Sequence, residues 1–170
     1  MYRYNSQTNQ YVKGFYADDT QDVTYYHDPA SAAVVIGQRK INNHWYSFAH
    51  NTGIMQTGFQ ILNDEANGSK TVYYNNYGQM LYNQQKISGS WYLFAAPTGA
   101  MQTGFHRVIT VGHEKNMVYY DLKSGKMLHN QQHIGKYWYA FKIETGAMLT
   151  GFWTVTDSKA KKQRKLFTTM

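Results

Sequence analysis

The sequence contains no cysteine and only two prolines among its 170 residues. Without cysteine the chain cannot form a disulfide framework, a thiolate metal site or a thiol nucleophile. It also lacks a run of about 18 apolar residues, so we expect no membrane span, and its first residues lack the apolar segment of a secretory signal. Charged residues make up 16% of the chain, which is too few for a disordered polyelectrolyte.

The positive charge of the chain is concentrated near its end. The formal net charge is +7, but residues 1–152 hold 12 Lys and Arg against 9 Asp and Glu, a balance of +3. The remaining residues add five basic side chains against one acidic side chain, and such a short basic run is typical of a solvated chain end. No basic residue recurs at a fixed position beside the aromatic residues, so we expect no specific nucleic-acid partner.

Aromatic residues and glycine are abundant instead. The chain has 16 Tyr, 8 Phe and 4 Trp together with 14 Gly, and 42% of its residues are apolar. Tyrosine, phenylalanine and tryptophan favour strands, whereas glycine favours the turns between them. The composition therefore indicates many short strands in one core or one continuous array.

Two segments recur along the chain. The first reads Trp-Tyr-x-Phe and then Gly-x-Met-x-Thr-Gly-Phe, with the last Phe 14 positions after the Trp, over residues 45–59, 91–105 and 138–152. The second reads Val-Tyr-Tyr, Gly-x-Met-Leu and Asn-Gln-Gln, over residues 72–85 and 118–132. A degenerate copy of the second segment opens at Thr24, with Ala32 near the glycine position, and in this alignment Asp121 corresponds to Asn75 and His27.

The repeats predict how the chain is divided. A β-hairpin array covers residues 1–152, with a half-repeat at 1–15 and full repeats at 16–59, 60–105 and 106–152, and a truncated repeat with a basic tail covers 153–170. Met1 lies in the register of the recurring Trp, and Phe167 lies in that of the second Tyr of Val-Tyr-Tyr. Because both ends fall inside a repeat, we expect a longer protein with an N-terminal catalytic domain outside this sequence.

Each short aromatic run followed by a glycine turn is typical of a β-hairpin. A lone two-stranded hairpin is marginal in water, so successive hairpins must stack to bury their apolar faces. The sequence predicts an all-β fold, a solenoid of stacked short β-hairpins. Its aromatic and methionine side chains either form the core of this thin structure or line shallow clefts that suit sugar faces and quaternary ammonium groups.

The recurring strings resemble the cell-wall-binding repeats of the choline-binding type. These repeats occur at the carboxyl ends of endolysins, autolysins and surface proteins of Gram-positive bacteria and their phages, and the Asn-Gln-Gln-Lys-Ile string is most similar to versions attached to lysozyme-type muramidases of lactobacilli and their phages. The resemblance implies a non-catalytic targeting module that binds a repetitive wall polymer: teichoic acid, a polysaccharide or a choline-like group. It also implies an extracellular or wall location, or the host cytoplasm before lysis for a phage endolysin.

The resemblance further implies ligand sites made of aromatic residues from consecutive hairpins together with a methionine. The implied ligand-binding residues are Trp45, Met55 and Phe59 with Tyr74; Trp91, Met101 and Phe105 with Tyr120; and Trp138, Met148 and Phe152. The third site would be completed by Phe167 in the last, eroded repeat. The family's Gly-Trp is Gly-Phe in every copy here, and because Phe is the weaker cation–π partner, a wall carbohydrate is as plausible as choline.

The residues favour binding over catalysis. His129 and His133 have the spacing of a zinc-binding helix pair but lack its glutamate, and no paired carboxylates point to glycoside hydrolysis. We therefore expect no catalytic residues, no metal site and no cofactor. The alternatives are an α-glucan-binding region of a glucansucrase and a wall hydrolase active by itself, and a homodimer remains open.

Overall fold

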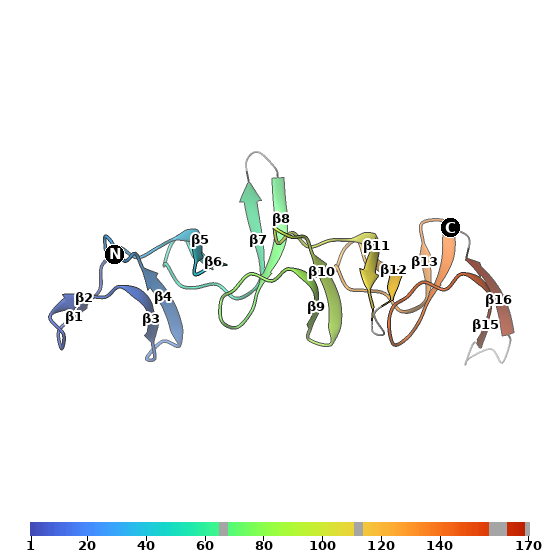
Figure 1. Ribbon diagram of the computed structural model, residues 1–170, viewed down its shortest axis with the longest axis horizontal. Helices are drawn as coiled ribbons and strands as arrows, with labels where there is room; N and C mark the ends of the chain where they lie inside the picture. The colour runs from blue at the N-terminus through green and yellow to red at the C-terminus, as the bar shows by residue number, and fades with distance from the viewer. Residues whose placement is uncertain (65–67, 111–113, 157–162, 169–170) are drawn as a thin grey trace. The chain divides into compact units, whose positions relative to one another are not determined.

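The computed structural model describes residues 1–64, 68–110, 114–156 and 163–168, without the side chains of residue 64 and of residues from 152 onward. Its strands all pair into two-stranded antiparallel sheets, each made of neighbours in the sequence (Figure 1). The strands are β1 Tyr4–Asn5, β2 Gln10–Tyr11, β3 Gly14–Asp18, β4 Val23–His27, β5 Gly37–Ile41, β6 His44–Phe48, β7 Gly58–Asp64, β8 Gly68–Tyr74, β9 Asn83–Ile87, β10 Ser90–Phe94, β11 Gly104–Ile109, β12 Lys115–Tyr120, β13 Asn130–Ile134, β14 Tyr137–Phe141, β15 Gly151–Thr156 and β16 Gln163–Thr168.

The alternation of side chains along each strand determines which rings are buried. In β10, Tyr92 and Phe94 are 5% and 1% exposed, whereas Trp91 and Leu93 point to the other face and are half-buried. The predicted fold class, an all-β solenoid of stacked short hairpins, is confirmed. The division of the chain into repeats at 16–59, 60–105 and 106–152 remains a proposed one.

The chain forms two compact units. The first contains β1 to β8 and residues 97–100, and the second contains β9 to β16 with its connecting segments. In the first unit, Ile41, Tyr46 and Phe48 form a buried cluster against which Tyr26 and Met55 pack. A buried cluster of the second unit consists of Val108, Val118, Tyr120 and Met127. The core of each unit is therefore made of the inward rings of successive hairpins and the methionines between them.

The recurring Gly-x-Met joins one hairpin to the next. The methionine two residues after the glycine forms a bridge with the last residue of the preceding hairpin, as between Met127 and Tyr120. Its side chain then fills the space above the next such glycine: a Cβ on Gly146 would lie 2.7 Å from the Met127 Cε, and one on Gly125 would lie 2.8 Å from the Met101 Cε. Both glycines have positive φ, so close contact and backbone conformation each require glycine.

The degenerate first copy is shifted by one residue relative to the sequence alignment. Asp121 accepts hydrogen bonds from the backbone and hydroxyl of Ser124, and Asp28 accepts the same two bonds from Ser31. Asp28, and not His27, is therefore the counterpart of Asp121. Ala32 takes the turn position at φ 59°, although it carries a Cβ.

These turns predict sensitivity to acid. The hydrogen bonds from Ser124 hold the pKa of Asp121 below its ordinary value of 3.8. Stability from a lowered carboxyl pKa is present above the unfolded value and is lost as the pH falls below it. We expect Asp121→Asn to fold but to be less stable than the unaltered chain at pH 7, because a neutral amide oxygen accepts the Ser124 bonds less strongly than a carboxylate, and to lose less stability in acid. Asn75 already occupies the equivalent turn position, where its side-chain oxygen accepts from the Tyr77 and Gln79 N–H groups. Urea midpoints from pH 7 to pH 3 measure this, and identical acid slopes for the two proteins would contradict it.

Candidate ring-lined binding sites

A cleft beside Trp45 lies in the first unit and is called the Trp45 cleft. It has a volume of about 120 Å³. Its lining residues are Gln38, Trp45, Lys70, Met80, Pro97 and Thr98. The Met80 N–H donates to the Trp45 carbonyl at 2.8 Å, which holds the methionine beside the indole. Trp45 is 36% exposed, so its ring is open to a ligand.

The same cleft recurs in the second unit beside Trp91, with a volume of about 50 Å³. The residues lining this Trp91 cleft are Gln84, Trp91, Ile109, Thr110, Met127, Glu144 and Thr145. The Met127 N–H donates to the Trp91 carbonyl at 2.8 Å, repeating the bond at Trp45. Four of these lining residues therefore have an identical counterpart in the Trp45 cleft, one repeat earlier in the sequence: Gln84, Trp91, Met127 and Thr145.

A third cleft, nearer the N-terminus and with a volume of about 270 Å³, lies beside Met1. The Val34 N–H donates to the Met1 carbonyl at 2.9 Å, so Met1 takes the place of the tryptophan and Val34 that of the methionine. This agrees with the register expected from the sequence for Met1. This cleft has no indole, and the rings that line it are those of Tyr2, Tyr25 and His27.

The structure places Tyr74 and Tyr120 behind the clefts and not in them. Both side chains are 0% exposed. The Gln38 amide donates to the Tyr74 hydroxyl at 2.8 Å, and the Gln84 amide donates to the Tyr120 hydroxyl at 3.0 Å. Burial raises the pKa of Tyr120 to about 12. These tyrosines fix the glutamine that lines the cleft, so their role in this structure is to position a lining residue.

The cleft methionines are Met80 and Met127, which the sequence analysis did not select. Met55 lies instead beside β4, because its N–H donates to the Thr24 carbonyl, and its side chain packs against Gly78. Met101 packs against Gly125 in the same way. The methionine beside Trp45 or Trp91 lies in the segment that follows the next hairpin along the chain, a long-range relation that spacing alone does not reveal.

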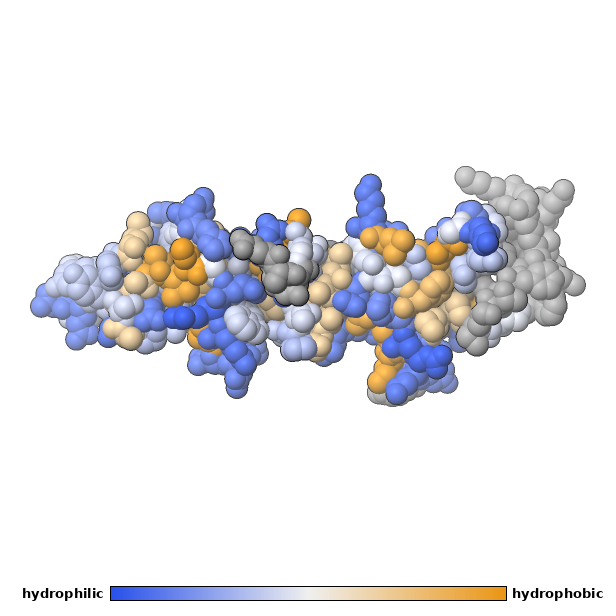
Figure 2. Space-filling view, turned by 90° about the horizontal axis from the view of Figure 1, so that it is seen from above, coloured by the Kyte–Doolittle hydropathy of each residue, from blue (hydrophilic) through white to orange (hydrophobic). Residues whose placement is uncertain are grey.

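The predicted phenylalanines form a second kind of site. Phe105 is 41% exposed and packs against Tyr119 and Tyr139, with ring centroids 4.7 and 5.1 Å away. Phe59 is 43% exposed and packs against Tyr73 at 4.8 Å. Neither phenylalanine is among the residues that line the tryptophan clefts. Figure 2 shows separate hydrophobic patches on one face, divided by hydrophilic residues.

The tyrosines of these phenylalanine sites were missed by the sequence analysis. The alternation of strand residues was the available signal, because cross-strand partners share a face and Tyr73 pairs with Phe59, as Tyr119 does with Phe105. The next tyrosine along each strand, Tyr74 or Tyr120, necessarily points the other way.

The third predicted site is only partly described. Trp138 is 52% exposed and packs against His133, with ring centroids 4.8 Å apart. Met148 forms a bridge with Phe141, and its N–H donates to the Met117 carbonyl. The backbone of Phe152 pairs with Phe167, but the side chains of both lie outside the described part of the chain.

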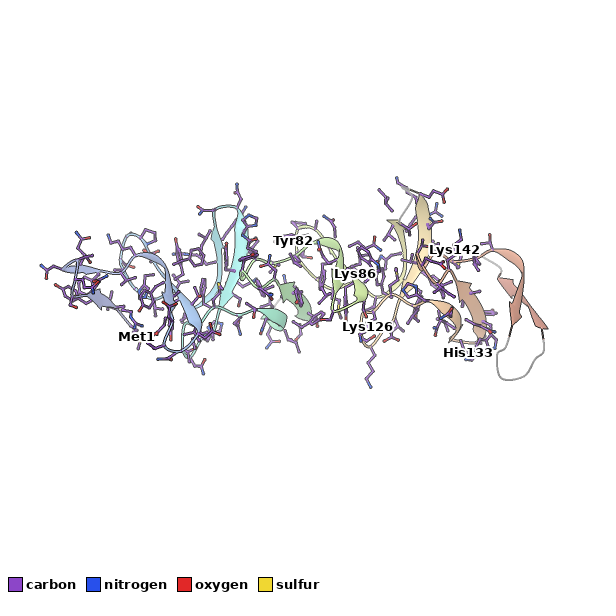
Figure 3. The ribbon with its side chains drawn as sticks, turned by 90° about the horizontal axis from the view of Figure 1, so that it is seen from below. Met1, Tyr82, Lys86, Lys126, His133 and Lys142 are labelled. Carbon is purple, nitrogen blue, oxygen red and sulfur yellow. The ribbon has the colours of Figure 1, made fainter. Side chains whose placement is uncertain are left out.

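Basic residues do recur beside the rings, contrary to the expectation from the sequence. The strand registers place Lys40 opposite Trp45, Lys86 opposite Trp91 and His133 opposite Trp138. Directly opposed side chains share a face of the hairpin. Lys86 and His133 are labelled in Figure 3, on β9 and β13. Three tryptophans therefore have a basic cross-strand neighbour, whereas Trp153 pairs with Leu166. The sequence analysis missed the pattern because it depends on cross-strand pairing.

The described residues contain no group of three His, Cys, Asp or Glu side chains that could hold a metal ion. His133 lies on a strand and His129 immediately precedes it, so they do not form the two-histidine face of a zinc-binding helix. Among these residues no helix is long and apolar enough to span a membrane.

Comparisons with known proteins were made on sequence and on structure. No family model and no curated protein matches the sequence. Choline binding protein F from Streptococcus pneumoniae has a TM-score of 0.69 and 27% identity, covering 84% of this chain and 43% of that chain. CbpJ from Streptococcus pneumoniae TIGR4 has a TM-score of 0.73 and 27% identity, covering 91% of this chain and 51% of that chain. The chain thus spans about half the length of these structures.

The Cpl-1 endolysin has the same fold, with a TM-score of 0.52 and 21% identity over 82% of this chain and 37% of that chain. The stacked hairpins, the recurring Gly-x-Met joints and the half-exposed rings agree with these likenesses. In its fold and its repeated hairpins, the chain is similar to these choline-binding proteins.

Proposed function

We propose that the chain is a non-catalytic module that binds a repetitive polymer of a Gram-positive cell wall, a teichoic acid or another glycan, through its ring-lined sites. The observation that carries this proposal is the repetition of one half-exposed tryptophan cleft, with the same backbone hydrogen bond to a methionine, in both units. The likeness to choline binding protein F, a protein whose structure was also determined in the presence of a peptidoglycan analogue, supports wall binding and with it an extracellular or wall location.

A wall polymer suits several shallow sites better than a single small ligand does. Each cleft presents one flat ring, one methionine and one fixed glutamine amide, an arrangement that fits the apolar face and hydroxyl groups of a sugar. Linked weak sites raise the effective concentration for each other, so overall binding can exceed single-site affinity by about 100 to 10,000-fold.

The phenylalanine sites are the proposed positions for a choline-like group. Phe105, Tyr119 and Tyr139 present three rings from two successive hairpins, and rings attract a quaternary ammonium group through their quadrupole. Phenylalanine is the weakest ring for this contact, so we place carbohydrate at the tryptophan clefts and at most a weak ammonium contact here.

The proposal predicts that Trp91→Ala lowers retention of the protein on purified Gram-positive walls by about 3 to 10-fold, because the ring at the centre of one cleft is lost. The measurement is a pull-down on lactobacillar walls, with thermal unfolding to show that the variant is folded. Tyr77→Ala is the matched control, because Tyr77 is 79% exposed and is not among the residues that line the clefts. Retention of Trp91→Ala equal to that of the control would count against the cleft.

Binding and lysis assays on the same purified walls test the two alternative functions, an α-glucan-binding region and a wall hydrolase. Binding to dextran but not to walls would favour an α-glucan-binding region. Clearing of a wall suspension by the chain alone would identify a wall hydrolase, and we expect no clearing.

A further inference from the structure

The Trp45 and Trp91 clefts have the same framework but differ in charge. Gln38, Trp45, Met80 and Thr98 of the first cleft correspond to Gln84, Trp91, Met127 and Thr145 of the second. Because these four framework residues are the same, the residues that differ between the two clefts are the ones we expect to determine ligand preference.

The Trp45 cleft is bordered by two cations. Lys70 lines it, and the Lys70 ammonium donates to the Thr98 carbonyl at 3.1 Å, which holds the ammonium at the cleft and leaves two of its three N–H groups for a ligand. Lys40 pairs across the hairpin with Trp45 and lies two residues beyond Gln38, so it shares the face of the cleft. Among the described residues that line this cleft, none is acidic.

A carboxylate that contacts β5 is paired with a residue other than Lys40. Asp28 forms an ion pair with the guanidinium of Arg39 at 2.6 Å. Arg39 adjoins Lys40 on β5 and so points to the opposite face of the hairpin. Lys40 itself makes no ion pair with a described residue, so its charge remains available to a ligand.

The Trp91 cleft has lost one of these cations and gained a carboxylate. Asn116 stands four residues before buried Tyr120, as Lys70 does before Tyr74, and its amide donates to the Thr110 hydroxyl at 2.8 Å. Glu144 lines the cleft in the place of Pro97 and makes no ion pair with a described residue. The opposite charges of Lys86 and Glu144 cancel at the Trp91 cleft. At the Trp45 cleft, Lys40 and Lys70 give two positive charges and no negative one.

We propose that the Trp45 cleft selects an anionic sugar or polyol unit, one that carries a phosphate or a carboxylate, whereas the Trp91 cleft takes neutral units. The ring covers the apolar face of the unit, and the two lysines bind its anion; lysine is a compact point charge well suited to phosphate. The inference rests on the proposed binding of a wall polymer and adds that the polymer is anionic.

A site-resolved titration tests the assignment. The indole N–H signals of Trp45 and Trp91 are followed by NMR, after identification with single Trp→Phe variants, during addition of glycerol 3-phosphate, glucuronate or neutral glycerol. We expect saturable shifts at Trp45 with one or both anions, weakened by raising the salt concentration, and no comparable response at Trp91 or with glycerol. The tighter anion identifies the source of the charge. Equal responses at both indoles, or equal responses to glycerol, would overturn the proposal.

Exchanging the differing residues gives matched variants, since each new residue already stands at the equivalent position in the other unit. Lys70→Asn with Pro97→Glu should weaken anion binding at Trp45 at least fivefold. Asn116→Lys with Glu144→Pro should create anion binding at Trp91, which keeps the test open if the first variant fails to fold. Unchanged affinities in both folded variants would refute the charge assignment.

The failure of this inference can be told apart from failure of wall binding. If Trp91→Ala still lowers wall retention while Trp45 shows no anion preference, wall binding stands and the charge assignment falls. An oligonucleotide is the control for a nucleic-acid ligand. If it shifts the Trp45 signal at the same phosphate concentration as glycerol 3-phosphate or a lower one, the assignment to a wall unit is overturned.

Discussion

Replacement of Trp45, Trp91 and Trp138 together by alanine is expected to reduce retention on Gram-positive walls by about 100-fold or more. The single change at Trp91 removes one contact, whereas the triple change removes the flat ring from every tryptophan site and with it the avidity that linked weak sites provide. Equilibrium depletion of the protein from solution by increasing amounts of wall measures the loss.

The matched control removes three exposed apolar side chains from turns outside the clefts. Tyr77, Leu122 and Ile143 are 79%, 68% and 66% exposed. Their replacement by alanine should change wall retention less than threefold, since surface substitutions of this kind leave folding nearly unchanged. A triple tryptophan variant that is folded and retained as well as this control would show that the clefts do not bind the wall.

Replacement of Tyr120 by alanine is expected to lower the free energy of unfolding by about 3 to 5 kcal/mol, the range for truncating a large buried ring. Tyr120 has no exposed surface and packs with Val108, Val118 and Met127. Urea unfolding at pH 7 measures the loss. A cost below about 1 kcal/mol would contradict the packing described for the second unit.

Tyr120→Phe separates the ring from its hydroxyl. It keeps the packing but removes the acceptor of the Gln84 hydrogen bond, at a cost of about 1 kcal/mol. Burial raises the pKa of Tyr120 to about 12 from an ordinary value of 10.0, so stability from the neutral form is present below pH 10 and is lost as the pH rises from 10 toward 12. The phenylalanine variant should therefore lose less stability than the unaltered chain over this alkaline range.

The fold could be predicted from the sequence because its determinants are local. Trp-Tyr-x-Phe specifies a strand, Gly-x-Met specifies a joint, and their recurrence forces hairpins to stack, since a single hairpin cannot bury its apolar face. The alignment was wrong by one residue in the first and the last copy. Asp28 and not His27 accepts the turn hydrogen bonds, and Phe167 pairs with Phe152 as Tyr73 pairs with Phe59, so it corresponds to the first and not the second Tyr of Val-Tyr-Tyr.

The composition of the sites could be predicted only in part. The sequence left open whether its rings form the core or line clefts. Trp45, Phe59 and Phe105 are 36 to 43% exposed, and Trp91 is partly buried against the core of its unit, and these rings belong to two kinds of site. Met80 lies 35 residues after Trp45, and its place beside that ring depends on how the chain returns after an intervening hairpin. The lysines opposite the tryptophans depend on cross-strand register, which a linear comparison of repeats does not contain.

The most direct test is an NMR titration of the whole chain with a soluble polymer fragment released from Gram-positive walls. The account predicts that the indole signals of Trp45, Trp91 and Trp138 shift or broaden together, while the backbone signals of the buried Tyr74 and Tyr120 keep their positions. Wall-bound protein in which the three indole signals stay unchanged would contradict it.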